Sequence, residues 1–183
     1  MSMKQTLDVL NAMHRDGVIG PYALAGAVAA FNYLEPAVTD DLDVLISFQT
    51  KSGLIDLAPV FDDLRARGYE THQREGIVIE GWPVQFIPAV DELDAEALAN
   101  AEDIEIKMPS EAPVRTRILQ PEYLAAIALR VGRAKDQFRI AQFLEEKAVS
   151  TEKLCAILRR HDLIQKWQSF CARAGINDPC RVE

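Results

Sequence analysis

Apolar positions recur along the chain with two different spacings, and the alternation of the two predicts an α/β protein. Spacings of three and four residues are typical of amphipathic helices, whereas short apolar or alternating runs are typical of strands. Over the first two-thirds of the chain, the predicted elements are a helix around 7–13, a strand at 21–26, a helix at 27–34, a strand at 42–47, a helix at 56–67, a hairpin at 77–89, an acidic helix at 91–101 and a strand at 103–109.

From Pro121 onward the pattern is helical to the end of the chain. Four periodic segments follow one another, at 121–133, 134–147, 150–161 and 162–174. The predicted fold class is therefore α/β (α+β), a mixed sheet flanked by helices over residues 1–115, with a helical C-terminal segment over 116–183 packed on it.

Composition and charge narrow the class of protein. The 183 residues are 49% hydrophobic and 26% charged, as in an ordinary soluble globular protein. A net charge of −8 argues against extended binding of nucleic acid, because such binding neutralises phosphates with basic residues. No apolar run approaches the ~20 residues that cross a bilayer, and the N-terminus lacks the apolar core of a signal peptide. We therefore expect no membrane contact and a cytoplasmic location.

The three cysteines support the same location. Cys155, Cys171 and Cys180 are odd in number and lack the spacing of metal ligands. We expect three reduced thiols, as is usual in the cytosol.

Two acidic residues at the start of a predicted strand are the candidate chemistry. Asp41 and Asp43 stand at positions i and i+2 in VTDDLDVLIS, so in an extended strand they share one face, ~7 Å apart. Carboxylates this close repel each other unless a cation lies between them, and Mg²⁺ is usually held by one or two carboxylates plus substrate phosphates. The alternative is that Asp41 closes a turn and Asp43 is a solvated strand end.

The order of these features resembles the nucleotidyltransferase superfamily of polymerase-β-like fold, specifically its small prokaryotic members with a helical tail. The stretch YALAGAVAAFNYLEPAVTDDLDVLI, residues 22–46, carries the resemblance, and LQPEYLAAIALRVGRAKDQFRIAQFL, residues 119–144, resembles the helical part of the same proteins. In that family a glycine with a small partner opens a helix that holds the triphosphate, and a D-x-D pair on the next strand binds metal.

Carried over to this chain, the resemblance implies a site of five residues. Asp41 and Asp43 would be the catalytic, metal-binding pair for Mg²⁺ or Mn²⁺, Gly26 and Ala27 would lie at the phosphates, and Lys135 of an R-x-K-D element would contact phosphate. A glycine at a helix start lets a phosphate approach the backbone closely. The alternatives are a plain strand-to-helix turn at Gly26 and a helix-surface pair or cap at Lys135.

Several departures from the family pattern bear on activity. Relatives often have Gly or Ser where this chain has Ala27, arginine where it has Ala37, and lysine where it has Ala128. Active members carry a third carboxylate at the position of Gln85, and an amide offers a metal one oxygen but no charge. The acids considered as substitutes are Asp40, Glu80, Asp91 and Glu92.

Two functions follow from the resemblance. The first is metal-dependent transfer of a nucleoside monophosphate from an NTP, such as ATP, to an unknown acceptor hydroxyl. The second is a catalytically degenerate member that binds NTP or a protein partner, as an antitoxin-like or regulatory module. A third alternative is a scaffold that uses only the fold, since fold does not fix function. The sequence leaves open whether the chain is an enzyme.

Overall fold

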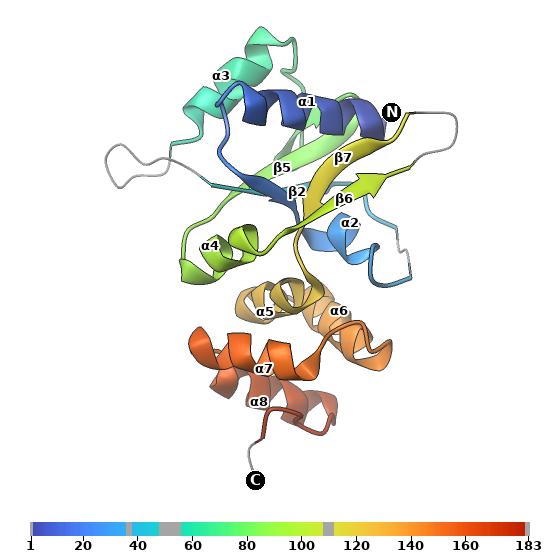
Figure 1. Cartoon of the computed structure of the whole chain (residues 1–183), viewed down its shortest axis with the longest axis vertical. Helices are drawn as coiled ribbons and strands as arrows, with labels where there is room; N and C mark the ends of the chain where they lie inside the picture. Colours follow the sequence, from blue (N-terminus) through green and yellow to red (C-terminus); the bar gives the residue numbers. More distant parts are fainter. Residues whose placement is uncertain (1, 36–37, 48–55, 108–111, 182–183) are drawn as a thin grey trace. The chain divides into compact units, whose positions relative to one another are not determined.

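The protein divides into two compact units, whose elements are labelled in Figure 1. The computed structural model describes residues 2–35, 38–47, 56–107 and 112–181. The first unit comprises Met1–Ala29 and Ala37–Leu119, and the second comprises Ala30–Pro36 and Gln120–Glu183.

The first unit is built on a seven-stranded mixed sheet with the strand order β3-β4-β5-β2-β1-β7-β6. Two neighbouring pairs, β2 with β5 and β1 with β7, are parallel, and the remaining pairs are antiparallel. The strands are β1 (Tyr22–Leu24), β2 (Leu42–Ile46), β3 (His72–Gln73), β4 (Gly76–Ile79), β5 (Trp82–Pro88), β6 (Glu102–Ile106) and β7 (Val114–Ile118).

Four helices accompany the sheet: α1 (Met3–Arg15), α2 (Gly26–Ala30), α3 (Ala58–Ala66) and α4 (Glu92–Ala99). In Figure 1, α1 and α3 lie on one side of the sheet, whereas α2 and α4 lie on the other. The helical spacing seen in the sequence accounts for α1, because Leu7, Leu10 and Met13 are completely buried. Asp91 caps α4 by accepting a hydrogen bond from the backbone N–H of Asp94. Helices thus cover both faces, and the central strands are buried.

The predicted hairpin is confirmed and has a defined turn. Ile79 pairs with Trp82, so the turn consists of Glu80 and Gly81, both with positive φ (51° and 89°). Positive φ at both central residues is the type I′ arrangement, whose twist matches that of the flanking strands. Strands β3 and β7 were not predicted from the sequence. Strand β7 pairs with both β1 and β6.

The second unit contains the four helices that the C-terminal periodicity predicts. They are α5 (Pro121–Val131), α6 (Ala134–Glu145), α7 (Thr151–Arg160) and α8 (Ile164–Ala174). Most of α5 is buried, and α6, α7 and α8 all pack against it. Its buried acid, Glu122, accepts a hydrogen bond from the Ser150 N–H and forms an ion pair with Lys153 (3.3 Å). Both partners come from the start of α7, so Glu122 joins α5 to α7.

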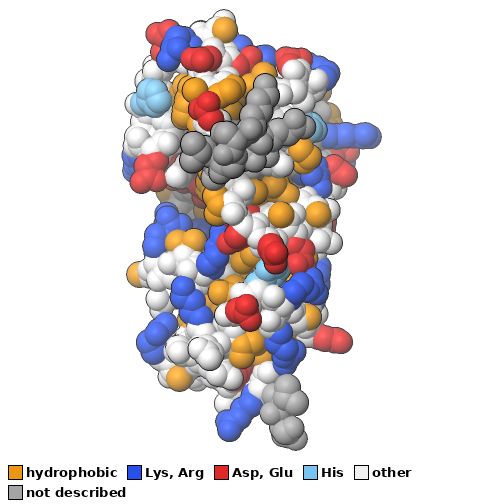
Figure 2. Space-filling model, turned by 90° about the vertical axis from the view of Figure 1, so that its left-hand side faces the viewer, with side chains coloured by type: hydrophobic (Ala, Val, Ile, Leu, Met, Phe, Trp, Pro, Cys, Tyr) orange, Lys and Arg blue, Asp and Glu red, His pale blue; other side chains and the backbone are white. Residues whose placement is uncertain are grey.

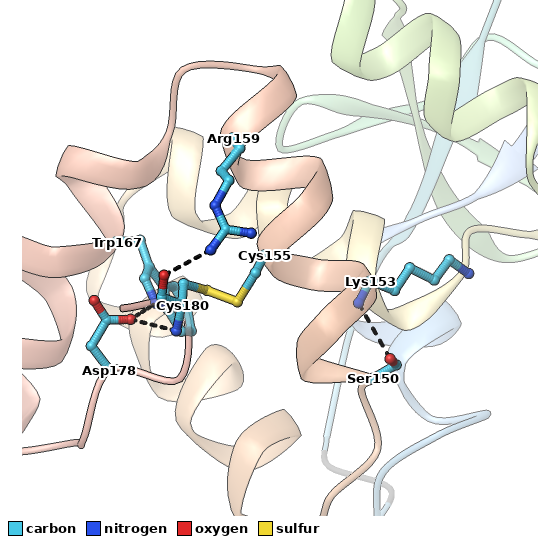
Figure 3. Close-up of a disulfide and its surroundings, with 7 residues drawn as sticks. All are labelled: Ser150, Lys153, Cys155, Arg159, Trp167, Asp178 and Cys180. Carbon is cyan, nitrogen blue, oxygen red and sulfur yellow. Dashed lines mark hydrogen bonds between the residues drawn. A yellow bond between two sulfur atoms is a disulfide. The ribbon is translucent and has the colours of Figure 1, made fainter. Parts of the chain in front are cut away.

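The expectation of three reduced thiols is wrong for two of the cysteines. Cys155 on α7 forms a disulfide with Cys180, which lies 25 residues further along the chain (Figure 3). The folded chain brings together two cysteines whose sequence spacing carried no signal. Cys171 remains a free, buried thiol, and burial raises its pKa to about 11. The thiol argument for a cytosolic location therefore no longer holds.

Hydrogen bonds surround the disulfide and hold the segment after α8 (Figure 3). Asp178 Oδ1 accepts hydrogen bonds from Trp167 Nε1 (2.8 Å) and from the Cys180 N–H (2.9 Å). Arg159 donates to the carbonyl oxygen of Cys180 (2.8 Å). The C-terminal segment is thereby attached to α7 and α8 by covalent and polar contacts.

No helix in the described part of the chain combines the length and the apolar character needed to span a membrane.

The disulfide predicts a specific count of thiols and a loss of stability on its removal. Alkylation in denaturant without reductant should modify Cys171 alone, and reduction should expose three thiols, as read by intact-mass spectrometry. Closing a loop of this length constrains the unfolded chain, so Cys180→Ser should cost about 3 kcal/mol of unfolding free energy. Cys171→Ser measures the effect of losing a buried thiol without the crosslink. Three alkylated cysteines before reduction would contradict the pairing.

Candidate functional site

The central strand pair of the first unit brings together two segments of the predicted site. Strands β2 and β5 are parallel, and their register places Asp43 directly opposite Gln85. Both side chains are partly exposed, although Leu42 and Val44 on either side of Asp43 are fully buried. Asp41 lies one residue before β2, and its Oδ1 accepts a hydrogen bond from the Thr39 hydroxyl (3.0 Å).

Gly26 is needed where it stands because the Asp43 side chain occupies the space beside it. Gly26 has φ +59°, a conformation that favours glycine. A Cβ built on Gly26 would lie 1.9 Å from Oδ2 and 2.7 Å from Cγ of Asp43. The backbone contributes to the same approach, since the Ala25 N–H donates to the carbonyl oxygen of Asp43 (2.9 Å). The strand-to-helix turn and the second acid of the pair are therefore in direct contact.

The turn between β3 and β4 also reaches this region. Gln73 pairs with Gly76, which leaves Arg74 and Glu75 as a two-residue turn. Gln85 Nε2 donates a hydrogen bond to the Glu75 carboxylate (2.9 Å), so its Oε1 is the atom left to act as a ligand. Arg74 forms an ion pair with Asp40 (3.0 Å), next to Asp41. A hairpin turn distant in sequence thus contacts β5 and the segment just before β2.

Three of the four acids considered as substitutes for a third carboxylate have other contacts. Asp40 pairs with Arg74, Asp91 caps α4, and Glu80 accepts a hydrogen bond from the Tyr69 hydroxyl (2.6 Å). Burial is the larger cause and the hydrogen bond to Glu80 the smaller one, and together they raise the pKa of Tyr69 to about 12. Glu92 is exposed in the first turn of α4. The acid that forms a hydrogen bond with Gln85 is Glu75, which was not predicted from the sequence.

The remaining predicted residues belong to short or separate elements. Ala27 is the second residue of α2, a helix of five residues. Lys135 is an exposed residue in the first turn of α6, in the second unit. Its neighbour Asp136 is buried and caps α6, accepting hydrogen bonds from the backbone and side chain of Arg133. That cap was the alternative considered for the R-x-K-D element. Ala37 lies outside the described residues.

The donor chemistry of the site suits a hard divalent cation. Asp41 and Asp43 offer carboxylate oxygens and Gln85 offers an amide oxygen, the ligand types that Mg²⁺ prefers. Among the residues described, no group of three or more His, Cys, Asp or Glu side chains is arranged to hold a metal ion. Mg²⁺ needs only one or two protein carboxylates when substrate phosphates complete its shell, so the donor set fits an ion that enters with a nucleotide.

The sequence contained a weak signal for the missed residues Arg74 and Glu75. A polar stretch, THQREG at residues 71–76, precedes the first strand of the predicted hairpin. Two polar residues before a glycine and an apolar run are compatible with a second tight turn. The exposed strand β3 has only two residues and no apolar pattern, so periodicity could not reveal it.

Comparison with known proteins supports the fold. No protein-family model matches the chain, and no curated protein sequence matches it significantly. A solved structure, an antigenic nucleotidyltransferase-like protein from Paracoccidioides brasiliensis, superimposes with a TM-score of 0.50, covering 94% of this chain and 93% of its own. Sequence identity is 14%, so the likeness concerns the fold alone. The chain has a nucleotidyltransferase-like α/β fold, as the sequence predicted.

The contact between Gly26 and Asp43 predicts a coupled loss of stability. Gly26→Ala should cost about 2–4 kcal/mol of unfolding free energy, because positive φ costs ~1–2 kcal/mol and overpacking against the Asp43 side chain costs a similar amount. In an Asp43→Ala background the cost should fall toward the backbone contribution alone, since the carboxylate is gone. Denaturant unfolding of the wild type, Gly26→Ala, Asp43→Ala and the double variant gives the coupling energy between the two positions.

Gly17→Ala is the matched control for that cycle. Gly17 also has positive φ (+75°), but a Cβ there would have nothing within 4 Å. Its cost should be the backbone contribution only and should be unchanged by Asp43→Ala. Equal costs at positions 17 and 26, with no coupling to Asp43, would show that the close contact has no energetic consequence.

Proposed function

We propose that the chain is a metal-dependent nucleotidyltransferase, which transfers a nucleoside monophosphate from an NTP such as ATP to an acceptor hydroxyl. The observation that carries the proposal is the in-register pairing of β2 with β5, with Asp43 opposite Gln85 and Asp41 just ahead of β2, in a nucleotidyltransferase-like fold. The activity is inferred from these residues, because one fold can carry many different activities.

Each residue has a role that follows from its chemistry. Asp41, Asp43 and the Gln85 amide oxygen would hold Mg²⁺ or Mn²⁺, which when bound neutralises phosphate charge. In the transfer, the acceptor oxygen bonds to the α-phosphorus, the bond from that phosphorus to the bridging oxygen breaks, and pyrophosphate leaves. The hydroxyl proton needs a carboxylate acceptor, and Gln85 cannot serve because an amide is not basic at neutral pH. That role falls to Asp41 or Asp43.

Charge supports a small nucleotide ligand rather than a long nucleic acid. The net charge is −8, and on the face shown in Figure 2 acidic and basic side chains are interspersed. Extended nucleic-acid binding needs a basic stripe that neutralises many phosphates. A single nucleotide needs only local compensation, which a divalent cation provides.

The second candidate is a degenerate nucleotide-binding module that acts through a protein partner, in an antitoxin-like or regulatory role. It is favoured by the neutral amide at Gln85, whose Nε2 is directed to Glu75. With two carboxylates in place of three, cation binding would depend more strongly on the nucleotide phosphates. Such a protein would bind an NTP together with the metal ion but would not transfer the nucleoside monophosphate to an acceptor.

Thermal unfolding with each of the four NTPs and Mg²⁺ or Mn²⁺ tests nucleotide binding. A ligand at 100 times its Kd stabilises the fold by ~2.7 kcal/mol, which is seen as a raised midpoint. Asp43→Asn keeps the side-chain shape but removes the charge, so it should abolish the shift. Asp103→Asn is the matched control, because Asp103 is 91% exposed on β6, three strands from β2 in the sheet.

The two candidate functions differ in a second measurement. With an NTP labelled at the α-phosphate, a transferase should move the label into an acceptor from fractionated extract or into a protein, and Asp43→Asn should prevent it. Binding without transfer favours the degenerate module. If no NTP shifts the midpoint with either metal, both nucleotide-based functions are contradicted.

A further inference from the structure

The turn between β3 and β4 makes two polar contacts with separate segments of the candidate site. Glu75 accepts a hydrogen bond from Gln85 on β5, and Arg74 forms an ion pair with Asp40, just before β2. Two adjacent residues of one turn therefore contact strand β5 and the segment that leads into β2. The proposed transfer reaction assigns no role to Arg74 or Glu75.

Strand pairing explains why this turn lies beside the site. Ile77 of β4 pairs with Val84 of β5, so the start of β4 runs next to Val84 and Gln85. The approach at Gly76 is close: a Cβ there would lie 2.9 Å from the Val84 carbonyl oxygen. Arg74 has φ +55°, which matches the positive φ that both common two-residue hairpin turns require at their first central position. The Gln85–Glu75 hydrogen bond then anchors the turn to β5.

The ion pair of Arg74 is of the kind that a ligand can exchange. The side chains of Arg74 and Asp40 are 65% and 57% exposed, so water screens their attraction. Exposed pairs of this kind contribute little to stability. Arginine forms paired hydrogen bonds with phosphate as readily as with carboxylate, because its planar donors fit both groups.

The charge of the neighbouring segment creates a need for such a cation. Asp40, Asp41 and Asp43 fall within four consecutive residues, and Glu75 adds a further carboxylate beside Gln85. A triphosphate approaching these acids is repelled by them. Arg74 brings a positive charge to the same segment. Its guanidinium has five N–H donors, which can bind phosphate oxygens directly without a bridging metal ion.

We propose that Arg74 is a phosphate-binding residue, which exchanges Asp40 for a phosphate of the bound nucleoside triphosphate. The inference rests on the proposed function, and it assigns to the β3–β4 turn the recognition of the phosphate chain. Asp40 holds the Arg74 guanidinium at the site when no nucleotide is bound. Gln85, through Glu75, keeps the turn against β5.

Binding of tripolyphosphate and of the four NTPs, each with Mg²⁺, tests this assignment by titration calorimetry. Arg74→Gln should weaken tripolyphosphate and NTP binding by about 10-fold to 100-fold, as expected for loss of a charge-assisted hydrogen bond. Asp40→Asn should instead tighten binding, because it releases Arg74 and removes a negative charge. The corresponding nucleosides should bind wild type and Arg74→Gln alike.

Arg65→Gln is the matched control. Arg65 on α3 is 63% exposed and pairs with Asp62 at 2.9 Å, much as Arg74 pairs with Asp40, so its loss should leave binding unchanged. Unfolding midpoints of all variants establish that they are folded, and Arg74→Lys, which keeps the charge, should retain part of the affinity. If wild type binds and Arg74→Gln binds as tightly, the inference is wrong while the proposed function stands. If wild type binds neither probe, both are overturned.

Discussion

The parallel pairing of β2 with β5 is the constraint on which the rest of the first unit depends. It joins residues about forty positions apart in the sequence, and it occupies the centre of a seven-stranded sheet. Leu42, Val44 and Ile46 are fully buried on β2, so a shift of register by one residue would turn this apolar set to the other face and carry Asp43 with it. The hydrophobic pattern therefore fixes the position of the acidic side chain as firmly as it fixes the fold.

Around that pair, close packing and polar contacts shape the candidate site. Because Gly26 has no Cβ, the Asp43 side chain can lie against the start of α2. Gly76 likewise lets β4 approach the backbone of Val84 closely. These two close approaches bring the β1–α2 turn to β2 and the β3–β4 turn to β5. The site is thus assembled from four segments, although only the one with Asp41 and Asp43 carries acidic residues that a sequence motif would mark.

The second unit is stabilised in a different way. Buried acids act there as joints and caps: Glu122 links α5 to α7, and Asp136 caps α6. The Cys155–Cys180 disulfide then holds the segment that follows α8, with Asp178 and Arg159 satisfying the polar groups beside it. These contacts lie within the second unit and involve none of Gly26, Asp41, Asp43 and Gln85.

Periodicity along the chain was enough to predict the fold class and most of the elements, because helix and strand spacing is a local property of the chain. A candidate site at Gly26, Asp41 and Asp43 was predicted from a stretch of sequence that resembles a known arrangement. The prediction missed β7, although V-R-T-R-I alternates apolar and polar residues as a strand does. It could not include the pairing of Cys155 with Cys180, which depends on how α7 and the segment after α8 meet. Only the tertiary structure placed Arg74 and Glu75 beside Asp40 and Gln85, because strand pairing, and not proximity along the chain, decides which side chains meet.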